Sequence, residues 1–275
     1  MNADIRLLII DPQNDFCDLP ERDRPAGFQP ALPVAGAHAD LRRLARALSA
    51  HPAKVSHLAI TLDTHHHYDV AHPGYWTTGA GAPVAPFTTI TARAVRAGEF
   101  RTRDSNDAAR TLAYLDALEA AGRYELMVWP VHCIEGNWGQ QIHDEVQAAI
   151  GVWAAQARQP ALVVHKGRNP YTEHYSALQA EVPVADDPAT ALNLELLRWV
   201  DQADALWVAG QASSHCVRAT VEHLVAHLPA ESASRITLLT DCMSPVAGFQ
   251  AQHDEFLENL RSQGARLAHA SEMFG

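Results

Sequence analysis

The chain alternates short apolar runs with segments of helical periodicity, and this alternation restricts its fold more than any other feature. Apolar runs of strand type lie at 5–10, 57–62, 125–129, 161–164, 205–209 and 236–239, with a further candidate at 265–269. Apolar residues at helical spacing predict helices at 37–49, 107–121, 139–150, 190–201, 214–227 and 248–262. Such an order is typical of a mostly parallel sheet with helices on both faces. We therefore predict a three-layer α/β/α fold with about six strands, of Rossmann type.

Residues 64–105 interrupt the alternation, show no clear periodicity and contain many Gly, Pro, His and aromatic residues. A stretch this long without regular structure is usually functional in a compact domain. Linkers are richer in charge, Gly or Ser and poorer in aromatic residues. We predict one domain over residues 1–275, with an insertion at about 64–105 that forms the wall or lid of a site.

Charge and hydrophobicity argue against several classes of partner. The formal net charge is −11 and no basic cluster is present, which argues against nucleic acid. No apolar run approaches the ~20 residues that a membrane span needs. The N-terminus lacks the basic and apolar regions of a signal peptide. The four cysteines, Cys17, Cys133, Cys216 and Cys242, form no CxxC pair and suit a reducing compartment, so we expect a cytoplasmic protein.

Three reactive side chains follow predicted strands: Asp11 the first, Lys166 the fourth, and Cys216 the fifth, at its junction with the next helix. Because ligands bind beyond the carboxyl ends of parallel strands, we expect these groups to meet there. A helix N-terminus favours the Cys216 thiolate. Asp11 can accept the thiol proton, and Lys166 can stabilise both anions. The alternatives are a buried structural cysteine, a turn aspartate before Pro12 and a solvated lysine.

A second group of side chains is typical of metal sites. Asp63-x-His65 follows the second predicted strand and places two metal-binding groups on the same side of an extended backbone. His132 follows the third predicted strand and completes a set of two histidines and a carboxylate, which suits Zn²⁺, Fe²⁺ or Mn²⁺. The adjacent His66 and His67 are expected to face solvent or to support the ligands from behind. The alternative is a polar loop with incidental histidines.

Several motifs resemble the nicotinamidase (pyrazinamidase) branch of the isochorismatase-like cysteine hydrolases. In chain order they are Leu8-Ile9-Ile10-Asp11-Pro12-Gln13-Asn14-Asp15-Phe16-Cys17, Asp63-x-His65, Trp129-Pro130-Val131-His132-Cys133-Ile134-Glu135-Gly136, His165-Lys166-Gly167 with Tyr175-Ser176-Ala177, and Gly210-Gln211-Ala212-Ser213-Ser214-His215-Cys216-Val217. The matches follow the family order from residue 7 to about residue 245. Together they are specific, although only the first and the last are strong alone.

The resemblance implies a catalytic triad of Asp11, Lys166 and Cys216. It also implies a non-proline cis peptide at the bond between Gln211 and Ala212, which costs about 3 kcal/mol. Such bonds are tolerated mainly at functional sites. The N–H groups of Ala212 and Cys216 would then point at one oxyanion.

The resemblance further implies one divalent metal, zinc in the first place, with iron or manganese as alternatives. The implied ligands are Asp63, His65, His132 and, at a more variable position, His72. Phe16 and Trp76 are expected to sandwich an aromatic ring, and Tyr175 is expected to be a third wall residue.

The implied activity is metal-dependent hydrolysis of nicotinamide to nicotinate and ammonia through a thioester on Cys216, a step of NAD salvage. Asn137, Asp18-Leu19-Pro20 and the long segment 73–105 depart from the family pattern. Because pocket walls set selectivity, another small amide, such as pyrazinamide, a ureido compound or an N-carbamoyl compound, is an alternative substrate. A non-catalytic binding protein on the same fold is a third interpretation. The resemblance also implies a homo-oligomer, a dimer or a tetramer.

Overall fold

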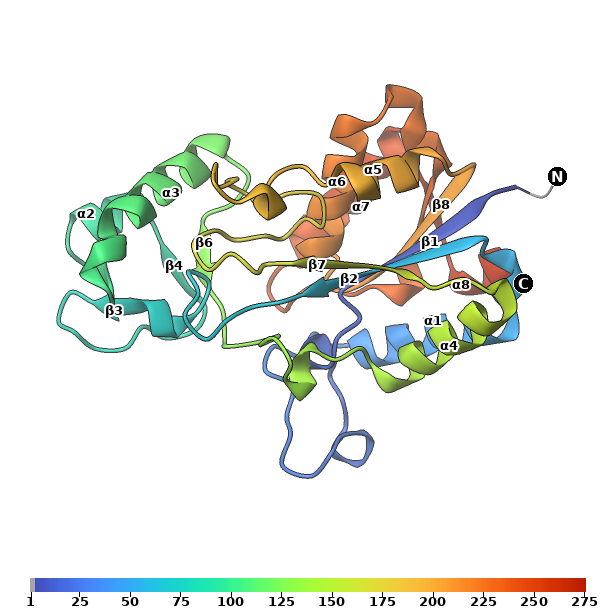
Figure 1. Cartoon of the computed structure of the whole chain (residues 1–275), viewed down its shortest axis with the longest axis horizontal. Coiled ribbons are helices and arrows are strands. Elements are labelled where there is room, and N and C mark those ends of the chain that lie inside the picture. The colour runs from blue at the N-terminus through green and yellow to red at the C-terminus, as the bar shows by residue number, and fades with distance from the viewer. Residues whose placement is uncertain (1–2) are drawn as a thin grey trace.

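A computed structural model describes residues 3–275; Met1 and Asn2, which belong to the predicted domain, lie outside the described residues. Six parallel strands form the central sheet (Figure 1). Their order is β10 (Arg266–Ala268), β9 (Ile236–Leu239), β8 (Ala205–Gly210), β1 (Ile5–Ile10), β2 (His57–Asp63) and β7 (Leu162–Lys166). The predicted three-layer α/β/α fold and its parallel sheet are therefore confirmed.

The two faces of the sheet are covered by separate helical layers (Figure 1). One layer contains α1 (Ala37–Ala50), α4 (Asp144–Ala157) and α8 (Ala270–Phe274), and the other contains α5 (Leu194–Asp201), α6 (Cys216–His227) and α7 (Gln250–Ser262). Residues of β1 alternate between them: Leu7 and Ile9 pack in the first core, Leu8 and Ile10 in the second. All four are fully buried, which explains why residues 7–10 of β1 are continuously apolar. Within the described residues, no helix is long and apolar enough to cross a membrane.

A third hydrophobic cluster lies beside the sheet and is built mainly from the segment between β2 and β7. It includes the short antiparallel pairs β3 (Trp76–Thr78) with β5 (Phe100–Thr102) and β4 (Thr88–Ile90) with β6 (Leu126–Val128). The helices α2 (Ala92–Arg96) and α3 (Ala108–Ala121) cover these strands (Figure 1). The segment 64–105, which shows no periodicity in the sequence, thus contains regular elements of three to five residues.

The predicted strand 125–129 does not join the central sheet. Its observed core, β6, pairs with β4, and the buried side chains of Leu126 and Val128 pack in the third cluster against Ile90 and Leu115. A short apolar run shows that a strand is buried but does not show which sheet it joins. His132 nevertheless reaches the site described below, because Trp129 N donates to Ala71 O and ties the two segments together.

Candidate active site

Four neighbouring strands contribute to a cluster of polar groups at the carboxyl edge of the sheet. Asp11 directly follows β1, Asp63 ends β2, Lys166 ends β7, and Cys216 begins α6 after β8. The strand register sets their relative heights, since Asp63 is the Cα partner of Lys166. All four side chains are buried. The edge predicted from the sequence therefore exists, and the structure brings Asp11, Lys166 and Cys216 together.

The Lys166 ammonium lies between two carboxylates and the thiol. Its Nζ is 2.9 Å from Asp11 Oδ2, 2.9 Å from Asp63 Oδ1 and 3.5 Å from Cys216 Sγ. Burial alone would lower the pKa of Lys166, but Asp11, Asp63 and Cys216 outweigh it and raise that pKa well above its ordinary value. Lys166 is therefore a permanent cation in the site.

The thiol of Cys216 is not the resting thiolate that its helix position suggests. Burial raises the pKa of Cys216 well above its ordinary value, and nearby Asp11 adds to this, although Lys166 opposes it. Burial also raises the pKa of Asp11, again opposed by Lys166. A base stronger than an ordinary carboxylate thus stands beside a neutral thiol. The helix N-terminus favours the thiolate, as the sequence indicates, but burial outweighs this effect at Cys216.

The turn before Cys216 has a backbone that few residues could adopt. Gly210 has a φ of 121°, and a Cβ there would lie 2.0 Å from Ile10 O, so only glycine fits against β1. The peptide bond between Gln211 and Ala212 is cis. Among residues 3–275, the N–H groups of Ala212 and Cys216 have no hydrogen-bond acceptor. Two free donors beside the thiol are the arrangement that an oxyanion requires.

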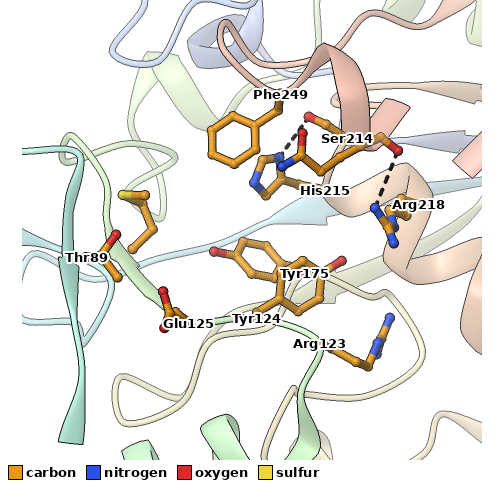
Figure 2. A pocket seen from close by; sticks show the side chains of 11 residues that line it. Thr89, Arg123, Tyr124, Glu125, Tyr175, Ser214, His215, Arg218 and Phe249 are labelled. Atoms are coloured by element: carbon orange, nitrogen blue, oxygen red, sulfur yellow. Dashed lines mark hydrogen bonds between the residues drawn. The ribbon is translucent and has the colours of Figure 1, made fainter. Parts of the chain in front are cut away.

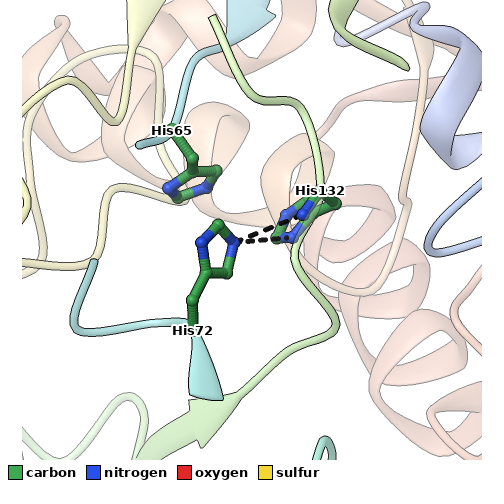
Figure 3. A group of neighbouring side chains, drawn as sticks. All are labelled: His65, His72 and His132. Carbon is green, nitrogen blue, oxygen red and sulfur yellow. Dashed lines mark hydrogen bonds between the residues drawn. The ribbon is translucent and has the colours of Figure 1, made fainter. Parts of the chain in front are cut away.

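Three histidines converge beside the triad (Figure 3). The candidate ligand atoms of His65, His72 and His132 all lie within 4.8 Å of one another. Asp63 Oδ2 lies 3.1 Å from His65 Nε2 and 3.5 Å from His132 Nε2. The structure therefore brings together the four predicted ligands, and Asp63 also touches Lys166.

The hydrogen bonds of the histidine rings fit a metal. His65 Nδ1 lies 2.9 Å from Asp69 Oδ2, His72 Nδ1 lies 3.0 Å from His66 O, and His132 Nδ1 lies 2.8 Å from Pro130 O. Each Nδ1 thus has an oxygen within hydrogen-bond distance, while His65 Nε2 lies 3.1 Å from Asp63 Oδ2 and His72 Nε2 lies 3.2 Å from His132 Nδ1; a bound metal would replace these two contacts. Burial, followed by the neighbouring His132 and His65, lowers the pKa of His72 to about 3, so its ring is in the neutral, metal-binding form.

Asp69 was not predicted from the sequence. It is 1% exposed and orients His65. The only sequence signal for Asp69 is its position four residues after the candidate ligand His65. Gln13 is a second unpredicted support, because its side chain holds both the N–H and the carbonyl of Asp63 at 2.7 and 2.8 Å.

A small cavity of about 30 Å³ lies above Cys216 and is lined in part by apolar side chains. Two of the three predicted wall residues, Phe16 and Tyr175, line it. Trp76 does not, and that prediction is wrong: it is fully buried in the third cluster, where its Nε1 donates to Val70 O at 2.8 Å. Trp129 is the tryptophan of the wall, and its Nε1 donates to the Tyr175 hydroxyl at 3.0 Å.

Glu173 is a further wall residue that the sequence did not reveal. It is 4% exposed, its Oε1 accepts from His174 N at 3.0 Å, and its Oε2 has no partner among the described residues. Burial raises the pKa of Glu173 to about 7. An unpaired carboxyl that titrates near neutrality inside a cavity is typical of a functional group.

Comparisons with known proteins find nicotinamidases, while no protein-family model matches the chain. The nicotinamidase of Saccharomyces cerevisiae is 25% identical over 143 residues, which cover 52% of this chain and 59% of that protein. The nicotinamidase of Escherichia coli is 33% identical over 96 residues, 34% of this chain and 37% of that protein. The aligned regions therefore span less than two thirds of these curated relatives.

Solved structures of similar fold cover almost the whole chain. A nicotinamidase/pyrazinamidase of Acinetobacter baumanii superposes with a TM-score of 0.62 at 17% identity, covering 99% of both chains. A pyrazinamidase of Pyrococcus horikoshii in complex with zinc gives 0.55 at 17% identity, covering 97% of this chain and 99% of that one. An isochorismatase family protein of Desulfovibrio vulgaris gives 0.53 at 16% identity, covering 99% and 97%. The resemblance to the nicotinamidase branch of the isochorismatase-like hydrolases is confirmed.

Proposed function

We propose that this protein is a metal-dependent cysteine amidohydrolase that converts nicotinamide to nicotinate and ammonia. The observation that carries the proposal is the contact of one buried ammonium, Lys166, with both the base Asp11 and the nucleophile Cys216. The similarity to two nicotinamidases supports the choice of substrate. The apolar and aromatic walls of the cavity suit a flat ring.

The first half of the reaction forms a thioester. Cys216 Sγ attacks the carboxamide carbon while its proton passes to Asp11, so the thiolate never has to exist free in the buried site. The free N–H groups of Ala212 and Cys216 stabilise the oxyanion of the tetrahedral intermediate. Asp11 then gives the proton to the departing nitrogen, and ammonia leaves as the C–N bond breaks. Lys166 stays charged throughout and keeps Asp11 ionised before each transfer.

The second half consumes one water. Asp11 takes a proton from the water, whose oxygen attacks the thioester carbon, and the same two N–H groups hold the new oxyanion. The carbon–sulfur bond then breaks, the sulfur of Cys216 recovers a proton from Asp11, and the acid is released. The sum is amide plus water to acid plus ammonia.

The metal of this proposal is a divalent ion, with zinc as the first choice, and His65, His72, His132 and Asp63 would hold it. One ring nitrogen from each of the three histidines and the carboxylate are a donor set that zinc, iron and manganese accept. Such an ion would supply a Lewis-acidic centre that fixes the ring nitrogen of the substrate relative to Cys216. Phe16, Trp129 and Tyr175 orient the ring from the sides.

Ammonia release from nicotinamide tests the proposal. The wild-type protein should release ammonia, and Cys216→Ala should lower the rate by at least about a thousandfold without changing the circular-dichroism spectrum. Prolonged treatment with a strong chelator should inactivate the wild type, and added Zn²⁺, Fe²⁺ or Mn²⁺ should restore it. If Cys216→Ala keeps its full rate, the nucleophile is misassigned. If neither protein releases ammonia but the wild type binds the amide, the protein is a binding protein on this fold.

A second amide is the alternative substrate, because Asn137, Asp18-Leu19-Pro20 and the segment 73–105 depart from the family pattern. The same assay on pyrazinamide, a ureido compound and an N-carbamoyl compound ranks them by kcat/KM. The proposed setting is NAD salvage in the cytoplasm by a dimer or a tetramer. Light scattering of the purified protein, coupled to gel filtration, measures the oligomeric state.

A further inference from the structure

A second and larger cavity lies directly behind the wall of the candidate active site (Figure 2). Its volume is about 310 Å³. Tyr175 and His215 line both this outer cavity and the small cavity above Cys216, so the two spaces share a wall. We propose that the outer cavity binds a second molecule of an aromatic primary carboxamide, the substrate class of the proposed function, on which this inference rests.

The walls of the outer cavity suit a flat ring. Figure 2 shows Phe249 and His215 on one side and Tyr124 and Tyr175 on the other. The ring centroids of His215 and Phe249 are 4.6 Å apart, and those of Tyr124 and Tyr175 are 4.8 Å apart. Tyr124 and His215 are nearly parallel, with an interplanar angle of 21° and centroids 6.5 Å apart. Aromatic faces on two sides favour a planar aromatic ligand over a chain or a sugar.

Two polar atoms of the lining have no partner among residues 3–275. They are the hydroxyl oxygen of Tyr124 and the side-chain carbonyl oxygen Oε1 of Gln252, and both are buried. Buried polar atoms without partners are costly and rare in native proteins. Both atoms are closed off from solvent, so a side-chain rotation would have to turn them toward the cavity; Oε1 would then accept an N–H from a ligand, and the Tyr124 hydroxyl would donate to a carbonyl. A primary carboxamide carries an N–H donor and a C=O acceptor on one carbon.

The charges around the outer cavity favour the neutral amide over the carboxylate product. Arg123 is paired with Glu181 at 3.3 Å and with Glu222 at 3.0 Å. Arg218 is likewise paired with Glu222, at 2.8 Å, and with Glu255, at 3.3 Å. Both cations are thus compensated, and Glu125 adds a further negative charge to the lining. A carboxylate ligand would meet no unpaired cation here and would be repelled, whereas an amide would not.

A ligand in the outer cavity would therefore touch the outer faces of the two side chains that close the active cavity. The outer cavity would act as a waiting position for the amide, next to the shared wall, and it would release the acid readily. The outer cavity would thus discriminate between the substrate and the product by their charge alone.

The methyl resonance of Met127 provides the test. Met127 lines the outer cavity, and the chain has only four methionines, so ¹³C-methyl labelling gives a simple spectrum. The metal-loaded Cys216→Ala protein, which does not turn over, is titrated with nicotinamide and separately with nicotinate. We expect nicotinamide to shift the Met127 signal with a saturable curve, and nicotinate to need about a tenfold higher concentration.

Substitutions separate local binding from a relayed effect. Gln252→Leu removes the unpaired acceptor and should weaken nicotinamide binding, followed at Met127, by about tenfold. Gln250→Leu is the matched control on the same helix, because Gln250 is exposed and, within residues 3–275, its side chain forms a hydrogen bond with Asp254 alone; it should leave the curve unchanged. Tyr124→Phe is the second test variant, for use if Gln252→Leu does not fold, and it should weaken nicotinamide binding in the same way.

Three results would each overturn the outer site. They are a Met127 signal that does not move while nicotinamide saturates the protein, a shift that nicotinate produces at the same concentrations, and Gln252 and Tyr124 variants of the Cys216→Ala protein that titrate like Cys216→Ala alone. The last result would show that the signal is relayed from the inner cavity. Failure of the proposed function is distinct, because it appears as missing ammonia release by the wild type.

Discussion

Replacement of Lys166 by methionine tests the central electrostatic argument, because it removes the ammonium and keeps most of the side-chain volume. The variant leaves Asp11 and Asp63 buried without their shared cation, at 0% and 5% side-chain exposure. Loss of one partner from a buried ion pair costs about 3–5 kcal/mol. A domain of this size loses about 2–4 °C of melting temperature per kcal/mol, so we expect a fall of about 6–20 °C at pH 8.

The pH dependence of that loss makes the prediction specific. The folded variant can avoid the buried, unpaired charge by protonating Asp11. Relative to an unfolded pKa of about 3.9, this protonation requires about 5–6 kcal/mol at pH 8 but only about 1.5 kcal/mol at pH 5. Burial already raises the folded pKa of Asp11 in the wild type, and loss of the opposing Lys166 raises it further. The folded state then binds more protons than the unfolded state above pH 4, so its stability falls as the pH rises. The gap between variant and wild type should therefore widen from pH 5 to pH 8.

The assay is thermal unfolding of both proteins in chelator, at about pH 5 and about pH 8. The chain contains only one other lysine, Lys54, which is exposed and donates to Gly275 O at 3.1 Å. Lys54→Met is therefore the matched control and should change the melting temperature little. A gap that is equal at the two pH values, or a Lys54→Met variant that loses as much, would refute the reasoning.

Three further substitutions test the rest of the site. Asp69→Asn should weaken metal binding by about 10- to 100-fold in a chelator competition while the fold is kept, since Asp69 orients His65; unchanged affinity would mean that the contact is incidental. Glu173→Gln removes a buried carboxyl whose folded pKa is raised to about 7, so the wild type should lose up to about 3 kcal/mol of stability between pH 4.5 and pH 7 that the variant keeps; parallel stability curves would contradict this. Trp76→Phe should lower stability by about 1–3 kcal/mol, because Val70 O loses its donor, and leave KM unchanged; a raised KM would return Trp76 to the substrate wall.

The sequence was sufficient for the strands of the central sheet, apart from the wrongly included 125–129, and for the residues at its edge. These strands are largely apolar, Asp11, Asp63 and Lys166 directly end or follow them, and Cys216 begins the helix after β8, so local pattern and the geometry of parallel sheets place them together. The cis bond at Gln211 came only from the resemblance, since nothing local in composition or spacing indicates it.

The remainder depends on contacts between distant segments, which periodicity does not encode. Nothing in the local sequence distinguishes the role of Trp76 from that of Trp129. Only the packing of the third cluster places Trp76 in its interior, while Trp129 reaches the cavity. The pKa of Cys216 depends on distant segments in the same way. Its place at a helix N-terminus is local and visible, but its burial, which dominates its pKa, is set by the whole fold.

The third cluster has a consequence for how the protein would open. Lys166 ends β7, Asp11 follows β1 and Cys216 begins α6 after β8, whereas the chain around His72 and His132 is anchored by Val70 and Val128 in the third cluster. A segment built around its own hydrophobic cluster can unfold locally as one cooperative unit while the rest of the protein stays folded. Local unfolding of the third cluster would separate His72 and His132 from the other ligands and leave the triad in place. A metal held by Asp63 on the sheet and by His72 and His132 would stabilise the closed form of the third cluster. Its binding should therefore slow amide hydrogen exchange more in α3 than in β1.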